Sequence, residues 1–243
     1  MKVNVNEFRN FVQKATLNYT IDSININYDK ENDKVWSKMI STTSDAVSIL
    51  NVGNSIFTNV KDDVELNFCN PKTELKPYLD LIDDEEVEFK LHKNKIVLDK
   101  KVKIHFDDPS VVSTFGGNAP SDNIEYFVTL NVDEQFFNEF KKIKKIGNRF
   151  GKVYFTVTDN KLYLETMDKT NTYSNGISFE LCDVDTNDLS MCFDYNLFCN
   201  LMNVVDDENF KIKLTYMEER EGGMVYLYNL DESEQYFLMS KIE

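Results

Sequence analysis

The sequence contains two long segments that follow the same order of structural elements, and this duplication limits the possible folds more than any single residue does. Residues 63–91 comprise a strand pattern, a short helical pattern, an acidic turn and a second strand pattern, and residues 188–214 comprise the same four parts. Each half of the chain also begins with a Phe-rich amphipathic helical pattern. Because self-similarity along a chain indicates repeated structural units, the sequence predicts two copies of one domain.

The segment between the two copies has the composition of a linker. Residues 107–122 are rich in Gly, Pro, Ser and Asp, which favour turns over regular elements. We therefore predict domain 1 at residues 1–106, an interdomain connector at 107–123 and domain 2 at 124–243. The mixture of helical and strand patterns predicts an α+β fold in which each domain places two helices on a large antiparallel sheet.

The two longest helical patterns have a clear apolar face. In domain 1 a helix is predicted from Asn6 to Thr16, because apolar residues recur there at helical spacing. Its predicted buried residues are Phe8, Phe11, Val12 and Ala15. In domain 2 Asp133 is the predicted N-cap of a helix that extends to Ile146. Its predicted buried residues are Phe136, Phe137, Phe140 and Ile143.

Strand patterns fill most of the remaining chain and are separated by turn-forming residues. In domain 1 strands are predicted at 24–28, 35–41, 46–50, 64–68, 87–91 and 95–106. In domain 2 they are predicted at 124–130, 153–158, 162–167, 173–181, 189–193, 210–217, 224–228 and 235–242. Shorter helical patterns precede the acidic turns at 83–86 and 206–209.

The charge of the chain is unevenly distributed. The sequence has 27 Lys and Arg against 42 Asp and Glu, a net charge of −15. By itself this balance argues against a nucleic-acid partner, because phosphate binding requires cations. Residues 141–152, however, carry several Lys and Arg residues and no acidic residue. A basic strip on an acidic protein predicts that positive charge is concentrated on one surface.

Helical geometry places part of this strip on one side of the predicted helix. At 100° per residue, Asn138, Lys141, Lys142 and Lys145 lie opposite the Phe-rich face. On the last predicted helix, Asn196, Asn200 and Asn203 share a polar face without a carboxylate. That second face is explained either by simple solvation or by a position near phosphates, which a neutral face does not repel.

The residues needed for common catalytic or metal sites are sparse. The chain has four Cys and two His, without zinc-ligand spacing, a Gly-rich phosphate loop or a nucleophile motif. We therefore expect reduced cysteines, no metal, no cofactor and no enzymatic activity. The sequence also lacks an apolar run of about 20 residues and an apolar N-terminal signal segment. We expect a cytoplasmic protein with no membrane association, in a host cell if the protein is viral.

Taken in order along both halves, these features resemble DNA polymerase sliding clamps, particularly the processivity factors of T-even-type bacteriophages. The resemblance covers nearly the whole chain. It rests on the helix-first duplicated domain, the connector that begins at residues 107–112, the acidic turn after each second helix and the terminal strand at 235–243. The terminal strand also resembles the C-terminus of proliferating cell nuclear antigen.

The resemblance implies a ring. In this family, two-domain subunits assemble head to tail into a homotrimer of six domains, with helices lining a hole for duplex DNA and sheets outside. The implied partners are double-stranded DNA, held without sequence specificity, a DNA polymerase and a clamp-loader ATPase, in DNA replication that the resemblance assigns to a phage.

The resemblance also implies three sets of site residues. The predicted DNA-binding residues are Arg9, Lys14, Lys72, Lys76, Lys141, Lys142, Lys145 and Arg149, of which helical phase groups Lys141, Lys142 and Lys145. The implied pocket for a partner peptide consists of Ile40, Val47, Ile49, Val111, Val112, Phe237 and Met239. The implied subunit interface consists of Val102, Ile104, Phe106, Tyr173, Ile177 and Phe179.

Three alternatives remain open on the sequence. The first is a monomeric or dimeric processivity subunit that grips DNA without closing a ring, although it would need denser positive charge. The second is a metal-dependent nuclease or nucleotide hydrolase that uses the aspartates of the two acidic turns. The third is a scaffold that binds only proteins and does not need the basic strip.

Overall fold

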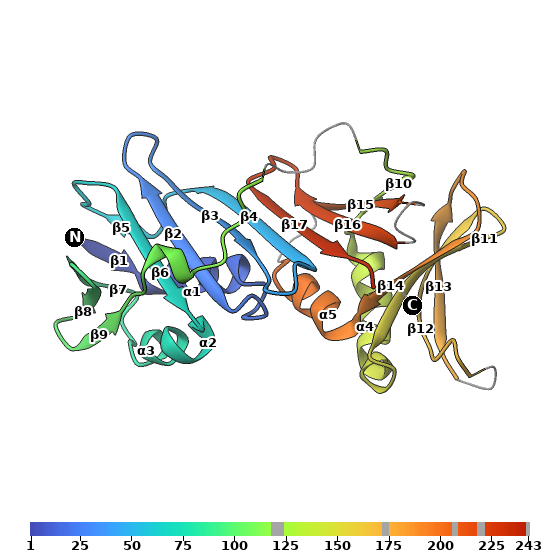
Figure 1. The fold of residues 1–243 in the computed structure, drawn as a ribbon, viewed down its shortest axis with the longest axis horizontal. Coiled ribbons are helices and arrows are strands. Elements are labelled where there is room, and N and C mark those ends of the chain that lie inside the picture. Colours follow the sequence, from blue (N-terminus) through green and yellow to red (C-terminus); the bar gives the residue numbers. More distant parts are fainter. Residues whose placement is uncertain (118–123, 172–174, 206–208, 218–221, 242–243) are drawn as a thin grey trace. The chain divides into compact units, whose positions relative to one another are not determined.

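The computed structural model describes residues 1–117, 124–171, 175–205, 209–217 and 222–241. The chain divides into two compact units, unit 1 at residues 1–117 and unit 2 at residues 118–243. In each unit helices pack against antiparallel strands (Figure 1). The predicted acidic turn at 206–209 lies largely outside the described residues, as does the end of the predicted connector.

The strands of unit 1 are arranged in two rows. The strands are β1 (Lys2–Asn4), β2 (Ser23–Asp29), β3 (Lys34–Ile40), β4 (Ala46–Gly53), β5 (Phe57–Thr58), β6 (Val64–Cys69), β7 (Glu86–His92), β8 (Lys95–Leu98) and β9 (Val102–His105). One row has the order β5-β1-β7-β8-β9 and the other has the order β4-β3-β2-β6. All of these pairings are antiparallel.

The helices of unit 1 are α1 (Val5–Ala15), α2 (Pro71–Glu74), α3 (Lys76–Asp80) and the short 3₁₀ helix η1 (Pro109–Val111). Asn4 caps α1, because its side-chain oxygen accepts the amides of Asn6 and Glu7, each at 3.1 Å. The second predicted helix is divided into α2 and α3 at Leu75, and both Leu75 and Leu79 are fully buried. These contacts hold the short helices against the core.

Unit 2 repeats this plan. Its strands are β10 (Val128–Asn131), β11 (Lys152–Thr158), β12 (Lys161–Thr166), β13 (Ile177–Asp183), β14 (Leu189–Asp194), β15 (Phe210–Met217), β16 (Gly222–Asn229) and β17 (Glu234–Met239). They form the rows β10-β15-β16-β17 and β13-β12-β11-β14. The order β4-β3-β2-β6 matches β13-β12-β11-β14 strand for strand, and β1-β7-β8-β9 matches β10-β15-β16-β17. The predicted duplication is therefore confirmed in the topology.

The helices of unit 2 are α4 (Glu134–Ile146), the 3₁₀ helix η2 (Gly147–Arg149) and α5 (Tyr195–Asn203). Asp133 caps α4 by accepting the amide of Phe136 at 2.8 Å, as predicted. The rings of Phe140 and Phe155 both meet Phe198 edge-on, with centroids 5.7 and 5.8 Å away. Aromatic contacts of this geometry join α4, α5 and β11 into one core.

The structure corrects several details of the predicted fold. The strands of each unit are divided between two rows instead of forming one large sheet. The predicted strand at 95–106 is two strands, because Asp99 and Lys100 adopt left-handed backbone angles that turn the chain. Phe137 is only half-buried, whereas the other three predicted core residues of α4 are buried.

Candidate nucleic-acid interface

The basic surface predicted on domain 2 is present on α4. Lys141, Lys142 and Lys145 are exposed on the side of the helix that faces away from the buried Phe136 and Phe140. They border an open surface hollow of about 640 Å³. Its lining residues are Glu134, Gln135, Asn138, Glu139, Lys141, Lys142 and Lys145. Helical phase alone therefore grouped these three lysines correctly.

The three lysines differ in their surroundings. Lys142 Nζ lies 2.8 Å from Glu139 Oε2 and 5.1 Å from the centroid of the Phe179 ring. In the part of the chain that the structure describes, Lys141 and Lys145 form no ion pair. Arg149 is also exposed, at the end of η2 that follows α4. The surface can therefore offer several cations to an anionic ligand.

Two hydrogen bonds join α5 to α4. The Tyr195 hydroxyl donates to the Lys144 carbonyl at 2.9 Å, and Lys144 Nζ donates to Asn203 Oδ1 at 2.9 Å. Burial raises the pKa of Tyr195 to about 12, because it disfavours the phenolate. Asn196 and Asn203 are exposed, so the predicted polar face of α5 exists. Neither hydrogen bond uses a cation of the hollow beside α4.

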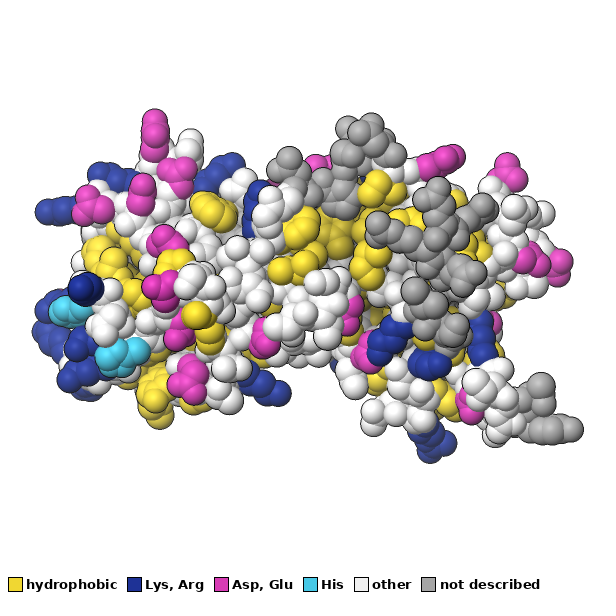
Figure 2. All heavy atoms as spheres, viewed as in Figure 1, with side chains coloured by type: hydrophobic (Ala, Val, Ile, Leu, Met, Phe, Trp, Pro, Cys, Tyr) yellow, Lys and Arg dark blue, Asp and Glu magenta, His cyan; other side chains and the backbone are white. Residues whose placement is uncertain are grey.

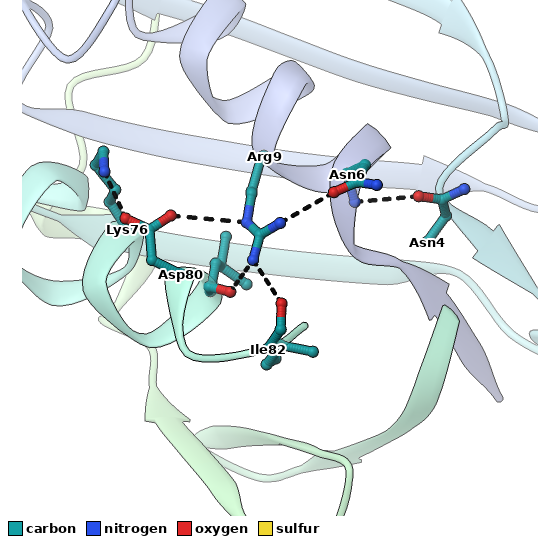
Figure 3. A network of polar contacts seen from close by, with 7 residues as sticks. Asn4, Asn6, Arg9, Lys76, Asp80 and Ile82 are labelled. Carbon is teal, nitrogen blue, oxygen red and sulfur yellow. Dashed lines mark hydrogen bonds and ion pairs between the residues drawn. The ribbon is translucent and has the colours of Figure 1, made fainter. Parts of the chain in front are cut away.

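In unit 1 the first and second helices are joined by Arg9 (Figure 3). The Arg9 guanidinium on α1 donates from Nη2 to the carbonyls of Leu79 and Ile82, the latter at 2.8 Å, and from Nη1 to Asn6 Oδ1 at 3.0 Å. Its Nε lies 3.7 Å from Asp80 Oδ1. Arg9 thus gives the Ile82 carbonyl just after α3 a donor and gives the Leu79 carbonyl a second donor beside the Ile82 amide at 3.1 Å. Its predicted contact with DNA stays a prediction.

Asp80 also binds Lys76, another residue that was predicted to contact DNA. Lys76 Nζ donates to Asp80 Oδ2 one helical turn along α3, and this hydrogen bond raises the pKa of Lys76. Lys72 is exposed, and Lys14 is half-buried. Sequence reasoning missed Asp80, although its spacing of four residues from Lys76 was a usable signal. The link to Arg9 had no such signal, because it spans about seventy positions.

The unit 1 part of the predicted peptide pocket lies where the connector meets β3. Residues of the connector pair with this strand, since the Ile40 amide donates to the Ser113 carbonyl at 3.3 Å and the Phe115 amide donates to the Lys38 carbonyl at 2.9 Å. Val111 is 57% exposed, whereas Val112 is buried. The connector is therefore held on unit 1 with one apolar side chain exposed to solvent.

The other predicted pocket residues lie on strands. Val47 pairs with Ile40 across β3 and β4, and Ile49 is buried on β4. In unit 2, Phe237 on β17 stacks on Tyr226 with centroids 4.7 Å apart, and Met239 is half-buried at the end of the strand. The pocket as a whole stays a prediction.

The predicted interface residues lie on strands at the edge of their rows. In unit 1, β9 is an edge strand on which Ile104 is buried and Val102 is half-buried, and Phe106 follows it. In unit 2, β13 is an edge strand with Ile177 and Phe179 half-buried. Tyr173 lies outside the described residues. An edge strand presents unpaired backbone groups to a further strand.

The two edges carry different charges. Basic side chains gather near His92 and His105 at the β7–β9 end of unit 1 (Figure 2). The β9 strand contributes Lys103, whereas β13 carries Asp183 and also Glu180, which pairs with Lys161 at 2.8 Å. The two edges therefore carry charges of opposite sign.

The described residues contain neither a candidate metal centre nor a helix that could span a membrane. Within the described ranges, no group of three or more His, Cys, Asp and Glu side chains is arranged to hold a metal ion. Within the same ranges, no helix combines the length and apolar character required to cross a membrane.

Comparisons with solved structures identify the fold. No protein-family model and no curated protein sequence matches the chain. The DNA polymerase III beta chain of Streptococcus pneumoniae superposes with a TM-score of 0.64 at 11% identity, over 100% of this chain and 64% of that chain. The H. pylori beta clamp bound to a DNA ligase peptide gives 0.62 at 16% identity, over 100% and 65%.

A third match has nearly the length of this chain. A. fulgidus PCNA, in a structure with the C-terminal region of FEN-1 bound, gives a TM-score of 0.65 at 13% identity, over 100% of this chain and 98% of that chain. The chain therefore has the fold of DNA polymerase sliding clamps. It spans less than two thirds of the length of the bacterial beta clamps that it matches.

Proposed function

We propose that the protein is a DNA polymerase sliding clamp, which encircles duplex DNA as a homotrimeric ring and gives a replicative polymerase its processivity. The observation that carries the proposal is the duplicated clamp fold with a cluster of exposed lysines on α4. Two similar units per chain would give a six-domain ring from three chains. On the sequence resemblance, the setting is phage DNA replication in the cytoplasm of a host cell.

The electrostatics of the chain support this function. A closed ring holds DNA by topology, so a few weak phosphate contacts are sufficient, and weak contacts permit sliding. The proposed DNA surface comprises Lys141, Lys142, Lys145 and Arg149 of unit 2, with Lys14 and Lys72 of unit 1. The net charge of −15 would repel DNA from the rest of the surface.

The strand edges support head-to-tail assembly. The basic β9 edge of one chain would meet the acidic β13 edge of the next, which pairs opposite charges and covers both exposed edges. The proposed interface residues are Val102, Ile104, Phe106, Tyr173, Ile177 and Phe179. Because exposed charges are screened by salt, such an interface weakens as ionic strength rises.

The proposed partners are proteins of replication. The fold neighbours include clamps in complex with the C-terminal region of FEN-1 and with a DNA ligase peptide. We extend this kind of contact to a peptide of the polymerase, received by Ile40, Val47, Ile49, Val111, Val112, Phe237 and Met239. A ring that is closed in solution also requires a clamp-loader ATPase to open it. The clamp itself acts without a cofactor and without catalysis.

Light scattering across a concentration series tests the proposed assembly. We expect the mass of three chains at low salt and a shift toward smaller species at high salt. A strict monomer at high protein concentration would contradict the stable trimer. It would favour instead the open-grip alternative, in which a monomer or dimer binds DNA by charge alone.

A further inference from the structure

Asp80 lies between two cations on the helix side of unit 1. Its Oδ2 accepts a hydrogen bond from Lys76 Nζ, and its Oδ1 lies 3.7 Å from Arg9 Nε (Figure 3). The side chains of Asp80 and Lys76 are 46% and 44% exposed. A ligand approaching this surface from solvent therefore meets the carboxylate together with the lysine.

A carboxylate that contacts two cations occupies the position that a phosphate oxygen would take. Lys and Arg side chains bind carboxylates and phosphates through the same charge-assisted hydrogen bonds. Asp80 also repels phosphate directly, whether or not it is hydrogen-bonded to Lys76. Exposed ion pairs contribute little to stability. A contribution to folding stability therefore does not explain why this ion pair is present.

We infer that Asp80 is an internal competitor for DNA phosphates, which withholds Lys76 from the duplex and weakens the hold of unit 1 on DNA. The inference rests on the proposed function, since it concerns the strength of contact on the same helix surface. A weaker hold suits a ring that must slide. Lys72, which is exposed on α2, provides the comparison, because in the described structure it forms no ion pair.

The main test replaces Asp80 with Asn, which keeps the shape and a hydrogen-bond acceptor but removes the charge. Binding to a short duplex is measured by fluorescence anisotropy over a range of salt concentrations. We expect D80N to raise affinity roughly two- to fivefold at low salt. The slope of log K against log salt should steepen by about 0.9 for each lysine that gains a phosphate contact.

Asp83→Asn is the matched control, because it removes the same charge from an exposed position three residues later. Equal effects of D80N and D83N would overturn the inference, since they would reflect net charge alone.

Lys76→Gln, made in the native protein and in D80N, completes the test. In the native protein K76Q should change DNA affinity less than Lys72→Gln does, because Lys76 is already occupied by Asp80. In the D80N background K76Q should remove most of the gain. If K76Q alone weakens binding as much as K72Q, the inference is wrong, and this comparison holds even if D80N fails to fold.

The same assay separates this inference from the proposed function. Native protein that binds duplex and loses affinity when the α4 lysines are replaced, with D80N unchanged, would overturn only the role of Asp80. Native protein without measurable affinity for duplex at low salt, alone or with D80N, would also overturn the role of Asp80, whereas the ring itself is tested separately by retention on circular DNA.

Discussion

The two units solve the same packing problem with different chemistry. In unit 1 the end of α3 is tied to α1 by the charged guanidinium of Arg9, which is itself balanced by Asp80. In unit 2 α4 is tied to α5 by the neutral hydroxyl of Tyr195 and by Lys144, neither of which lines the hollow beside α4. The first contact occupies charges of the helix surface, whereas the second leaves Lys141 and Lys145 unpaired within the described structure.

This difference shows how one duplicated fold can divide its tasks. The two units share their strand order, so the fold itself does not decide which unit offers positive charge. That choice is made by a few side chains at the helix ends. On this account unit 2 supplies most of the attraction for DNA, and the cations of unit 1 mainly hold its own helices together.

The largest expected effect comes from removing the cations of α4. Replacing Lys141, Lys142 and Lys145 together with Gln should lower duplex affinity on the order of a hundredfold near physiological salt and reduce the salt slope by about 0.9 for each lost phosphate contact. Replacing Lys30, Lys34 and Lys61 with Gln is the control, because it changes the net charge equally at exposed positions outside the helices. Equal losses of duplex affinity for both triple variants would contradict the claim that the α4 lysines of unit 2 supply most of the attraction for DNA.

The next effect concerns stability in unit 1. Arg9→Leu should lower the free energy of unfolding by about 2–3 kcal/mol, because it leaves the carbonyls of Leu79 and Ile82 without their charged donor. Urea unfolding followed by the fluorescence of Trp36, the single tryptophan of the chain, reports on this unit. Lys72→Leu, at an exposed site in the same unit, should change stability by less than about 0.5 kcal/mol. A comparably small change for Arg9 would show that it does not tie the helices.

The Tyr195 hydrogen bond of unit 2 should contribute less to stability than Arg9 does and should be sensitive to alkaline pH. Tyr195→Phe should cost about 1 kcal/mol through the lost hydrogen bond to the Lys144 carbonyl. The pKa of Tyr195 rises from 10.0 to about 12 on folding. The unfolded state therefore binds fewer protons between these values, and stability should fall as pH rises from 10 to 12.

Tyr195→Phe should flatten that decline, and circular dichroism across the pH range measures it. An unchanged profile in the variant would assign the alkaline loss to another group. Tyr28 in unit 1 is the first other group to test in that case, because burial and the nearby Asp33 also raise its pKa.

The smallest expected effect separates two neighbouring lysines of α4. Lys145→Gln should reduce the salt slope by about 0.9, whereas Lys144→Gln should leave it nearly unchanged. The reason is that Lys144 Nζ is already bound to Asn203, and Lys145 borders the open hollow. A larger effect for Lys144 would place the DNA contact nearer to α5.

The features that sequence predicted well are those set by local spacing. Asp133 caps α4, Phe136 and Phe140 are buried, and the three lysines share one surface, all of which follow from helical geometry. The short strands β1 and β5 were missed, because strands of this length are defined by partners far along the chain.

The network around Arg9 lay beyond sequence reasoning for the same reason. Sequence spacing shows that Lys76 and Asp80 are one helical turn apart, but it does not show that α1 brings Arg9 to the same carboxylate. Charge counting therefore treated Arg9 and Lys76 like the lysines of α4. Their different roles depend on tertiary contacts.

The most direct test of the central claim compares circular and linear DNA. The protein is loaded onto a nicked circular plasmid, separated from free protein at moderate salt, and the plasmid is then cut once with a restriction enzyme. A closed clamp should remain with the circle and be released after the cut, because topology holds it and the phosphate contacts are weak. Equal retention on circular and linear DNA would contradict the ring and show that charge alone holds the protein on DNA.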